Sequence, residues 1–209
     1  MPFFSAGDRP DSRVDVFVPV DEGGDPITVI GRGLSPPHFP IEPDGLLGAW
    51  RYVAVPEGEF AVEGFEVLAL DIPHKGGRTF GYRVSDGHSS VAYLPDHSPL
   101  VAGAGADGIG ELHANARRLA DGVDLLVHDA HHTRDELARW AHYGHSAPEY
   151  AVALAAAARA KRVLLFHHSP ARTDDEIDAL VAAVRASAPA GVDVDVAVEG
   201  MVLHLTGTL

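Results

Sequence analysis

The chain changes its hydrophobic pattern at one short stretch, Ser90-Val91-Ala92-Tyr93-Leu94-Pro95-Asp96. Upstream of it, short apolar runs between turns rich in glycine and proline predict a meander of strands. Downstream, predicted strands alternate with segments of helical spacing. This order favours an α/β sandwich with mixed sheets, and a single mainly parallel sheet is an alternative for residues 111–205.

Apolar runs bounded by turn residues predict the individual elements. Strands are expected at residues 13–19, 50–55, 65–72, 80–84, 89–94, 123–127, 162–166, 192–198 and 201–205, and helices at residues 111–120, 134–141, 146–160 and 174–188. The turn Ser85–His88 is expected to join two strands as a hairpin. Ser146 is expected to cap the third helix in a capping box with Glu149.

Composition limits the class of protein. A chain of 209 residues with 46% hydrophobic residues predicts one folded domain over residues 1–209. No apolar run approaches the roughly 20 residues that a membrane-spanning helix needs, and we expect a cytoplasmic protein. The net charge of −14, without a cluster of Lys and Arg, argues against nucleic acid as a partner. Because cysteine is absent, any metal ligands must be histidines and carboxylates.

Three candidate metal ligands stand where a predicted strand gives way to a loop. His74 follows the run Phe65–Pro73, Asp96 follows Leu94-Pro95, and His167 follows Arg162–Phe166. Imidazoles and a carboxylate at strand ends are typical of a metal site that keeps positions open for water and substrate. Each has a simpler alternative: a turn residue for His74, a turn cap for Asp96, and a hydrogen-bonded buried histidine for His167.

Other histidines are less informative. His145 precedes the predicted helix start, a position that favours bound anions such as phosphate. Because neighbouring strand residues point to opposite sides, only one of His167 and His168 is expected to face a site. The pair His131-His132 is expected in a loop, where exposure to solvent is one alternative. No role is assigned to His38, His88, His113 and His204.

Four segments, in order, resemble motifs of metallo-β-lactamase-fold phosphodiesterases of the ribonuclease Z branch. They are His74–Val84, Val91–His97, Gly144-His145-Ser146 (with Ala147 in place of threonine) and Leu165–Pro170. The resemblance begins at Pro2-Phe3-Phe4 and implies an αββα sandwich with mixed sheets. The family's His-x-His-x-Asp-His segment would precede Met1. We therefore expect that the N-terminal part of the fold is missing here, through a misassigned start, a fragment or a natural loss.

The resemblance also implies roles for individual residues. His74 would bind one metal ion, Asp96 would bridge two, and His167 would bind the other. His145 would orient or protonate the substrate phosphate, with Asp129 as its partner. No organic cofactor is implied, and the roles of His97 and His168 stay open.

The implied activity is hydrolysis of small phosphodiesters by a metal-bound hydroxide. Family members hold two ions roughly 3.5–4 Å apart, which are expected to be zinc, with manganese or iron as alternatives. A ribonuclease Z-like activity on RNA is less expected, because only residues 84–95 fill the place of the arm that would grip the RNA. A carboxylic ester or lactone is another candidate substrate. A non-catalytic, metal-poor binding or dimerisation module is the alternative from another class, so enzyme activity and a homodimer are both left open.

Overall fold

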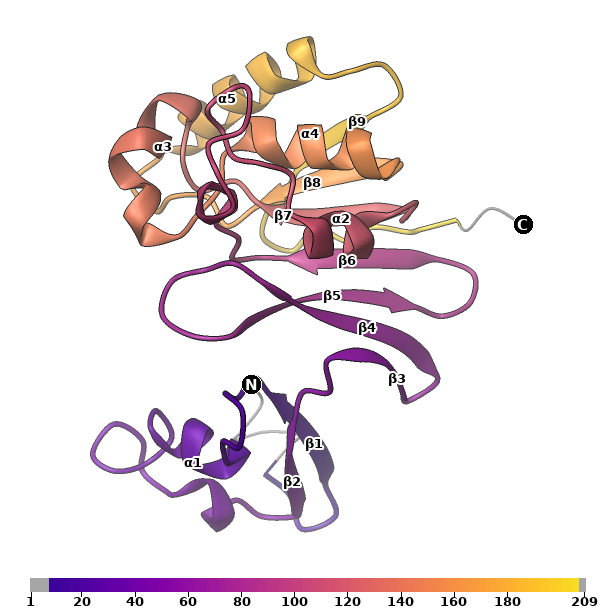
Figure 1. Cartoon of the computed structure of the whole chain (residues 1–209). Coiled ribbons are helices and arrows are strands. Elements are labelled where there is room, and N and C mark those ends of the chain that lie inside the picture. Colours follow the sequence, from indigo (N-terminus) through magenta and orange to yellow (C-terminus); the bar gives the residue numbers. More distant parts are fainter. Residues whose placement is uncertain (1–7, 207–209) are drawn as a thin grey trace. The chain divides into compact units, whose positions relative to one another are not determined.

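The computed structural model describes residues 8–206. The chain divides into two compact units, Met1–Pro56 and Glu57–Leu209. The first unit contains a parallel pair of strands, with a short helix and a 3-10 turn between them in the sequence (Figure 1). These elements are β1 (Arg13–Val18), α1 (Pro26–Gly31), η1 (Pro43–Gly45) and β2 (Ala49–Ala54). The parallel pairing fits the long connection, because a crossover between parallel strands needs a dozen residues or more.

The second unit is built on one seven-stranded sheet whose strands lie in chain order. The strands are β3 (Gly58–Val62), β4 (Phe65–Ile72), β5 (Thr79–Ser85), β6 (Ser90–Leu94), β7 (Leu125–Asp129), β8 (Arg162–Phe166) and β9 (Asp193–Val196). Strands β3 to β6 pair antiparallel, and β6 to β9 pair parallel. The mixed sheet and the hairpin between β5 and β6 are therefore confirmed.

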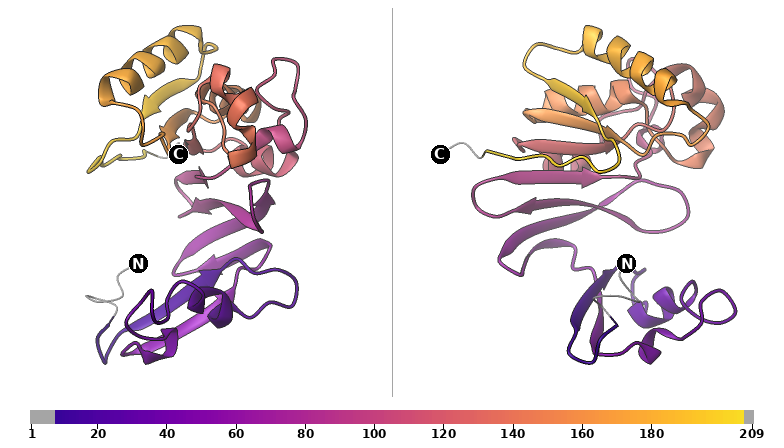
Figure 2. Two further views of the ribbon diagram at one scale, coloured as in Figure 1. Left: turned by 90° about the vertical axis from the view of Figure 1, so that its left-hand side faces the viewer. Right: turned by 180° about the vertical axis from the view of Figure 1, so that it is seen from behind.

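Helices cover the sheet as one layer. Helix α2 packs against α4, and α4 packs against α5 (Figures 1 and 2). The helical elements of this unit are η2 (Pro99–Val101), α2 (Ala114–Ala120), α3 (Arg134–Trp140), η3 (Ala141–Tyr143), α4 (Pro148–Ala158) and α5 (Asp174–Ser187). Buried alanines of α4, among them Ala151, Ala155 and Ala158, let this helix approach β7 and β8 closely. Leu126 and Leu165 of those strands are fully buried, and each contributes about 1.5–3 kcal/mol of burial free energy.

The predicted start of one helix is wrong. Helix α4 begins at Pro148 with Ala147 as its N-cap, whereas Ser146 is buried and donates to the carbonyl of Ala147. Proline favours the first helical position because its fixed φ suits the helix and its missing N–H would be unpaired there. The capping boxes of this unit occur at α3 and α5, in the pairs Thr133–Glu136 and Thr173–Glu176.

The ends of the sheet also differ from expectation. Residues 201–205 form no strand, and β3, which was not predicted, pairs with β4 alone. An edge strand is weakly marked in a sequence because its side chains meet neighbours on one side only.

The strand directions position the functional site. Because β4 is antiparallel to β5 and β5 is antiparallel to β6, strands β4 and β6 run the same way. Strands β7 and β8 are parallel to β6, so all four carboxyl ends lie at one edge of the sheet. The segments that follow them begin near Pro73, Pro95, Ala130 and His167. Residues far apart in the sequence are thereby brought together.

We predict that Gly81→Ala destabilises the second unit. A Cβ atom at Gly81 in β5 would come 2.7 Å from Cδ1 of Leu119 and 3.2 Å from Cγ of Leu94, both of which are fully buried. The crowding should lower the free energy of unfolding by about 1–3 kcal/mol, measured by urea titration with far-UV circular dichroism. As a control, Gly33→Ala places its Cβ in open space and should change stability by less than about 0.5 kcal/mol. Equal effects of the two substitutions would contradict this account of the packing.

Candidate metal centre

The candidate residues meet at the carboxyl edge of the sheet. Ligand-capable atoms of Asp96, Asp129, His145 and His167 all lie within 4.8 Å of one another. His74 joins them, with its Nε2 atom 4.0 Å from Oδ1 of Asp96. The structure thus brings together all five residues singled out in the sequence.

Asp96 is the common neighbour of three imidazoles. Its Oδ1 atom lies 3.4 Å from Nδ1 of His167, 3.9 Å from Nδ1 of His145 and 4.0 Å from Nε2 of His74. The Asp96 side chain is 38% exposed, and the described residues place no hydrogen-bond donor on it. The turn-cap alternative for Asp96 therefore finds no support.

The backbone of Gly144 holds His74. A carbonyl oxygen can only accept, so Nδ1 of His74 donates to the Gly144 carbonyl at 2.8 Å and leaves Nε2 as the free nitrogen. Gly144 has φ of 91°, and a Cβ there would come 3.0 Å from Nδ1 of His74 and 2.9 Å from the backbone nitrogen of Lys75. Both the left-handed backbone and the close approach require glycine at this position.

His167 lies directly after β8 in an uncommon backbone conformation, with φ of 57°. A non-glycine residue in this region costs of order 1–3 kcal/mol and often marks a functional site. Its Nδ1 atom lies 2.9 Å from the carbonyl oxygen of Pro95, which fixes the ring beside Asp96. The nearby carboxylate of Asp129 raises the pKa of His167. His168 does not join the cluster, as expected for one residue of the pair.

Asp129 is a fully buried carboxylate that orients its neighbours. Its Oδ2 atom accepts from Nδ1 of His145 at 2.8 Å and from the backbone N–H of His97 at 3.2 Å, while Oδ1 accepts from the backbone N–H of His131 at 2.9 Å. Burial alone would raise the pKa of Asp129, but the hydrogen bond from His145 and the nearby imidazole of His167, whose Nδ1 lies 3.8 Å from Oδ2, outweigh it and hold the pKa well below its usual value. Asp129 is therefore an ionised partner that leaves Nε2 of His145 available.

His131 and His132 lie in a loop, as expected, but neither side chain is exposed. His132 is buried, and burial lowers its pKa to about 4, so it is neutral at pH 7. The ring of His131 stacks on that of His145 with centroids 4.5 Å apart. Residues after a parallel strand fold back over the sheet edge, and here they form a wall of the site.

A second histidine pair lies buried behind the cluster. Nδ1 of His128 donates to the carbonyl of Asp129 at 2.8 Å, so its Nε2 must accept, and it does so from Nδ1 of His97 at 3.0 Å. Burial lowers the pKa of both rings and keeps them neutral. Sequence reasoning left the role of His97 open and overlooked His128, although its position inside an apolar strand was a usable signal.

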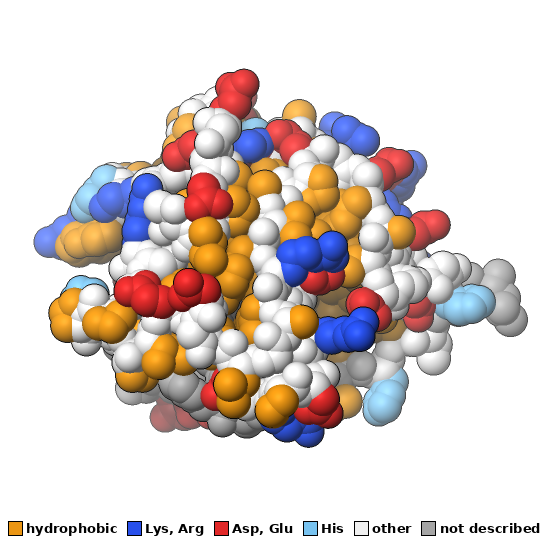
Figure 3. Space-filling view, turned by 90° about the horizontal axis from the view of Figure 1, so that it is seen from below, with side chains coloured by type: hydrophobic (Ala, Val, Ile, Leu, Met, Phe, Trp, Pro, Cys, Tyr) orange, Lys and Arg blue, Asp and Glu red, His pale blue; other side chains and the backbone are white. Residues whose placement is uncertain are grey.

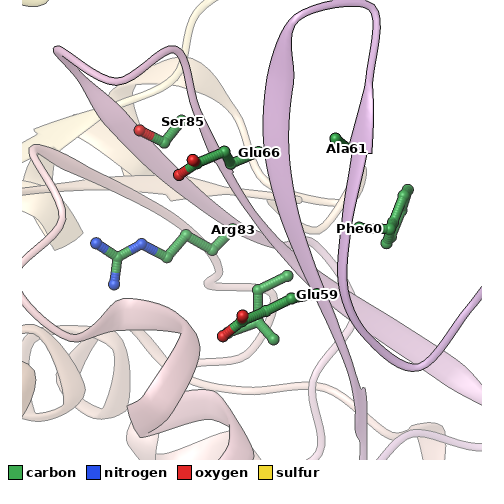
Figure 4. Close-up of a pocket in the computed structure, with 7 residues that line it drawn as sticks. Glu59, Phe60, Ala61, Glu66, Arg83 and Ser85 are labelled. Atoms are coloured by element: carbon green, nitrogen blue, oxygen red, sulfur yellow. The ribbon is translucent and has the colours of Figure 1, made fainter.

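Away from the His/Asp cluster, a hollow of about 470 Å³ lies on β3, β4 and β5. In the view of Figure 4, the side chain of Arg83 lies between those of Glu59 and Glu66. Arg83 also donates to the carbonyl of Asp121. None of the residues that line this hollow belongs to the His/Asp cluster.

The surface shows no concentration of positive charge on the face drawn in Figure 3, where Lys and Arg side chains are scattered among Asp and Glu. Among the helices of residues 8–206, none has the length and apolar character needed to cross a membrane. Imidazole nitrogen with carboxylate oxygen is a donor set that suits divalent transition metals, so the cluster fits a metal ion.

We predict that His97 and His128 stabilise the fold as a pair. Substituting His128→Leu alone leaves the Nδ1 donor of His97 buried without an acceptor and should cost about 1–3 kcal/mol in urea unfolding. Replacing both rings by leucine should cost less than the sum of the two single substitutions, because no unpaired donor then remains. Additive effects would show that the hydrogen bond between the rings contributes nothing to stability.

Comparisons with known proteins bear on the family and the fold. The family model described as beta-lactamase superfamily domain matches residues 35–168. A ribonuclease Z of Exiguobacterium sp. (strain ATCC BAA-1283 / AT1b) is 47% identical over 55 residues, which cover 26% of this chain and 18% of that protein. The chain thus matches only a small part of the length of this relative.

Solved structures show the same fold. The short form of human tRNase Z has a TM-score of 0.59 at 20% identity, over 92% of this chain and 68% of that one. Zn²⁺-bound PqqB from Methylobacterium extorquens has a TM-score of 0.62 at 18% identity, over 93% of this chain and 66% of that one. The predicted α/β class is confirmed, and the chain belongs to the beta-lactamase superfamily domain family, with the metallo-β-lactamase fold.

Proposed function

We propose that this chain is a metal-dependent hydrolase of small phosphodiesters. The observation that carries the proposal is the convergence of Asp96 with the imidazoles of His74, His145 and His167, beside the buried carboxylate of Asp129 that accepts from His145. The family assignment supports hydrolysis in general. The choice of small phosphodiesters as the substrate class is a further part of the proposal.

His74, Asp96 and His167 are the proposed metal ligands. The free Nε2 of His74 and the unbonded carboxylate of Asp96 support this assignment. A bound divalent ion would polarise the phosphate and activate water for attack on phosphorus. Zinc is the proposed metal, and the zinc in the similar fold of PqqB supports it. The two-ion centre, with its further ligands from a His-x-His-x-Asp-His segment, stays a prediction.

His145 is the proposed catalytic acid. Asp129 accepts from Nδ1 of His145, which fixes the ring orientation and stabilises the charged imidazole. Nε2 can then hold a proton for the leaving oxygen of the ester. Asp129 is the proposed positioning residue because both of its oxygens are already occupied by N–H donors.

RNA is the second candidate substrate. The local identity of 47% with a ribonuclease Z favours it, so the comparisons do not support our expectation against nucleic acid as a partner. The net charge of −14 favours a small diester, because an acidic protein repels a polyanion at long range. The cytoplasmic location and the homodimer stay predictions.

We predict that Asp96→Ala abolishes hydrolysis of bis(p-nitrophenyl) phosphate and lowers zinc content, because the imidazoles lose their shared carboxylate. Activity is followed by release of nitrophenol and zinc by elemental analysis of the dialysed protein. Asp178→Ala, an exposed change on α5, is the control and should match the wild type. Retention of most activity by Asp96→Ala would refute the role of this carboxylate. A wild-type chain with neither metal nor activity would instead favour the non-catalytic binding module.

We predict that His145→Ala lowers turnover about 10²- to 10⁴-fold while zinc content changes little, because a proton donor is lost and the proposed ligands remain. The same two measurements apply, with His88→Ala in the exposed β5–β6 turn as the control. A parallel loss of zinc and turnover would make His145 a metal ligand.

A further inference from the structure

A cavity of about 370 Å³ opens beside the His/Asp cluster, and we propose that it receives a flat aromatic ring carried by the phosphate ester. The inference rests on the proposed function for the phosphate but on separate residues for the ring. The cavity is lined by His131, His132, Trp140, Tyr143 and His145, together with Glu136 and the Ser169–Ala171 segment. Its volume falls within the range of sites for small organic ligands.

Aromatic side chains form the outer wall. Trp140 ends α3 and Tyr143 ends η3, and their ring centroids lie 5.7 Å apart. Tyr143 is 48% exposed, so part of this large ring is open to solvent beside Nζ of Lys75 and the ring of His142. Aromatic faces that are left open at a concave site offer stacking surface to a planar ligand.

Imidazoles form the inner wall. The buried ring of His132 and the stacked rings of His131 and His145 face the cavity from the loop after β7 and the segment before α4. Planar groups from the loop after β7, from the ends of α3 and η3 and from the segment before α4 thus bound the cavity. Such walls suit a thin, flat ligand better than a branched aliphatic one.

The charged side chains at the cavity do not favour a cationic ligand. The carboxylate of Glu136 is already engaged by the backbone N–H of Thr133 and by the guanidinium of Arg172. At the rim, Nζ of Lys75 lies 5.3 Å above the centroid of the Tyr143 ring. This ammonium complements the negative charge of a phosphate ester whose ring enters the cavity.

His145 connects the cavity with the proposed reaction centre. The same imidazole lines the cavity and donates to Asp129 within the cluster. A ring attached directly or through a sugar to the phosphorus would therefore enter the cavity while the phosphate stays at the cluster. Nucleobases and simple aryl groups share this chemistry.

The fluorescence of Trp140 can report binding in the cavity. The chain has two tryptophans, so Trp50→Phe leaves Trp140, which lines the cavity, as the only indole. In this full-length variant with zinc, Trp140 fluorescence is titrated with AMP, phenyl phosphate and ribose 5-phosphate, and also with adenosine and ribose. We expect a ring-bearing phosphate to bind about 5- to 150-fold more tightly than ribose 5-phosphate, the gain from stacking of one ring. If only AMP binds more tightly than ribose 5-phosphate, the ring that the cavity receives is a nucleobase. If only phenyl phosphate does, the ring is an aryl group.

Substitution of Tyr143 tests the location. Tyr143→Ala, in the Trp50→Phe background, should remove most of the extra affinity for ring-bearing phosphates and leave the affinity for ribose 5-phosphate unchanged. Phe65→Ala removes another exposed aromatic ring, 45% exposed and outside the cavity, and should keep the gain. Equal affinities for ring-bearing and ring-free phosphates, or an equal loss of both in Tyr143→Ala, would overturn the inference.

Adenosine and ribose separate this inference from the proposed function. Saturable quenching by adenosine but not by ribose, in a protein that hydrolyses no phosphodiester, would support the ring site and reject the hydrolase. Hydrolysis of bis(p-nitrophenyl) phosphate with no preference for any ring-bearing ligand would reject the ring site alone.

Discussion

The buried carboxylate of Asp129 is the constraint on which the site depends. An ionised group without solvent must be fully hydrogen-bonded, and Asp129 meets this need with N–H groups of His97, His131 and His145. Each donor comes from a different loop at the edge of the sheet. The electrostatic demand of one side chain thus fixes the conformation of three segments.

Strand direction explains why these loops meet at all. Four strands that run the same way end at one edge, so the residues that follow them are neighbours in space. The left-handed backbone of His167 then turns its imidazole toward Asp96 instead of continuing the strand. General topology brings the residues near one another, and local backbone geometry brings their nitrogen and oxygen atoms together.

Much of this arrangement could be predicted from the sequence. Apolar runs predict the central strands. The residues that the sequence singles out lie close together in the structure: His74, Asp96, Asp129, His145 and His167. The edge strand β3 and the start of α4 were not predicted, because sheet edges carry a weak pattern and Pro148 outweighs Ser146 as a start signal. The walls made by His132 and Trp140 depend on tertiary contacts between loops, which no local pattern encodes.

The order of strands in the large sheet has a consequence for biosynthesis. Each strand from β4 to β9 lies beside the strand that immediately precedes it in the chain. A polypeptide that emerges from the ribosome amino end first always finds the docking edge for its next strand already made. The sheet can therefore grow vectorially, and none of its described strands needs a later segment to be inserted between two earlier ones.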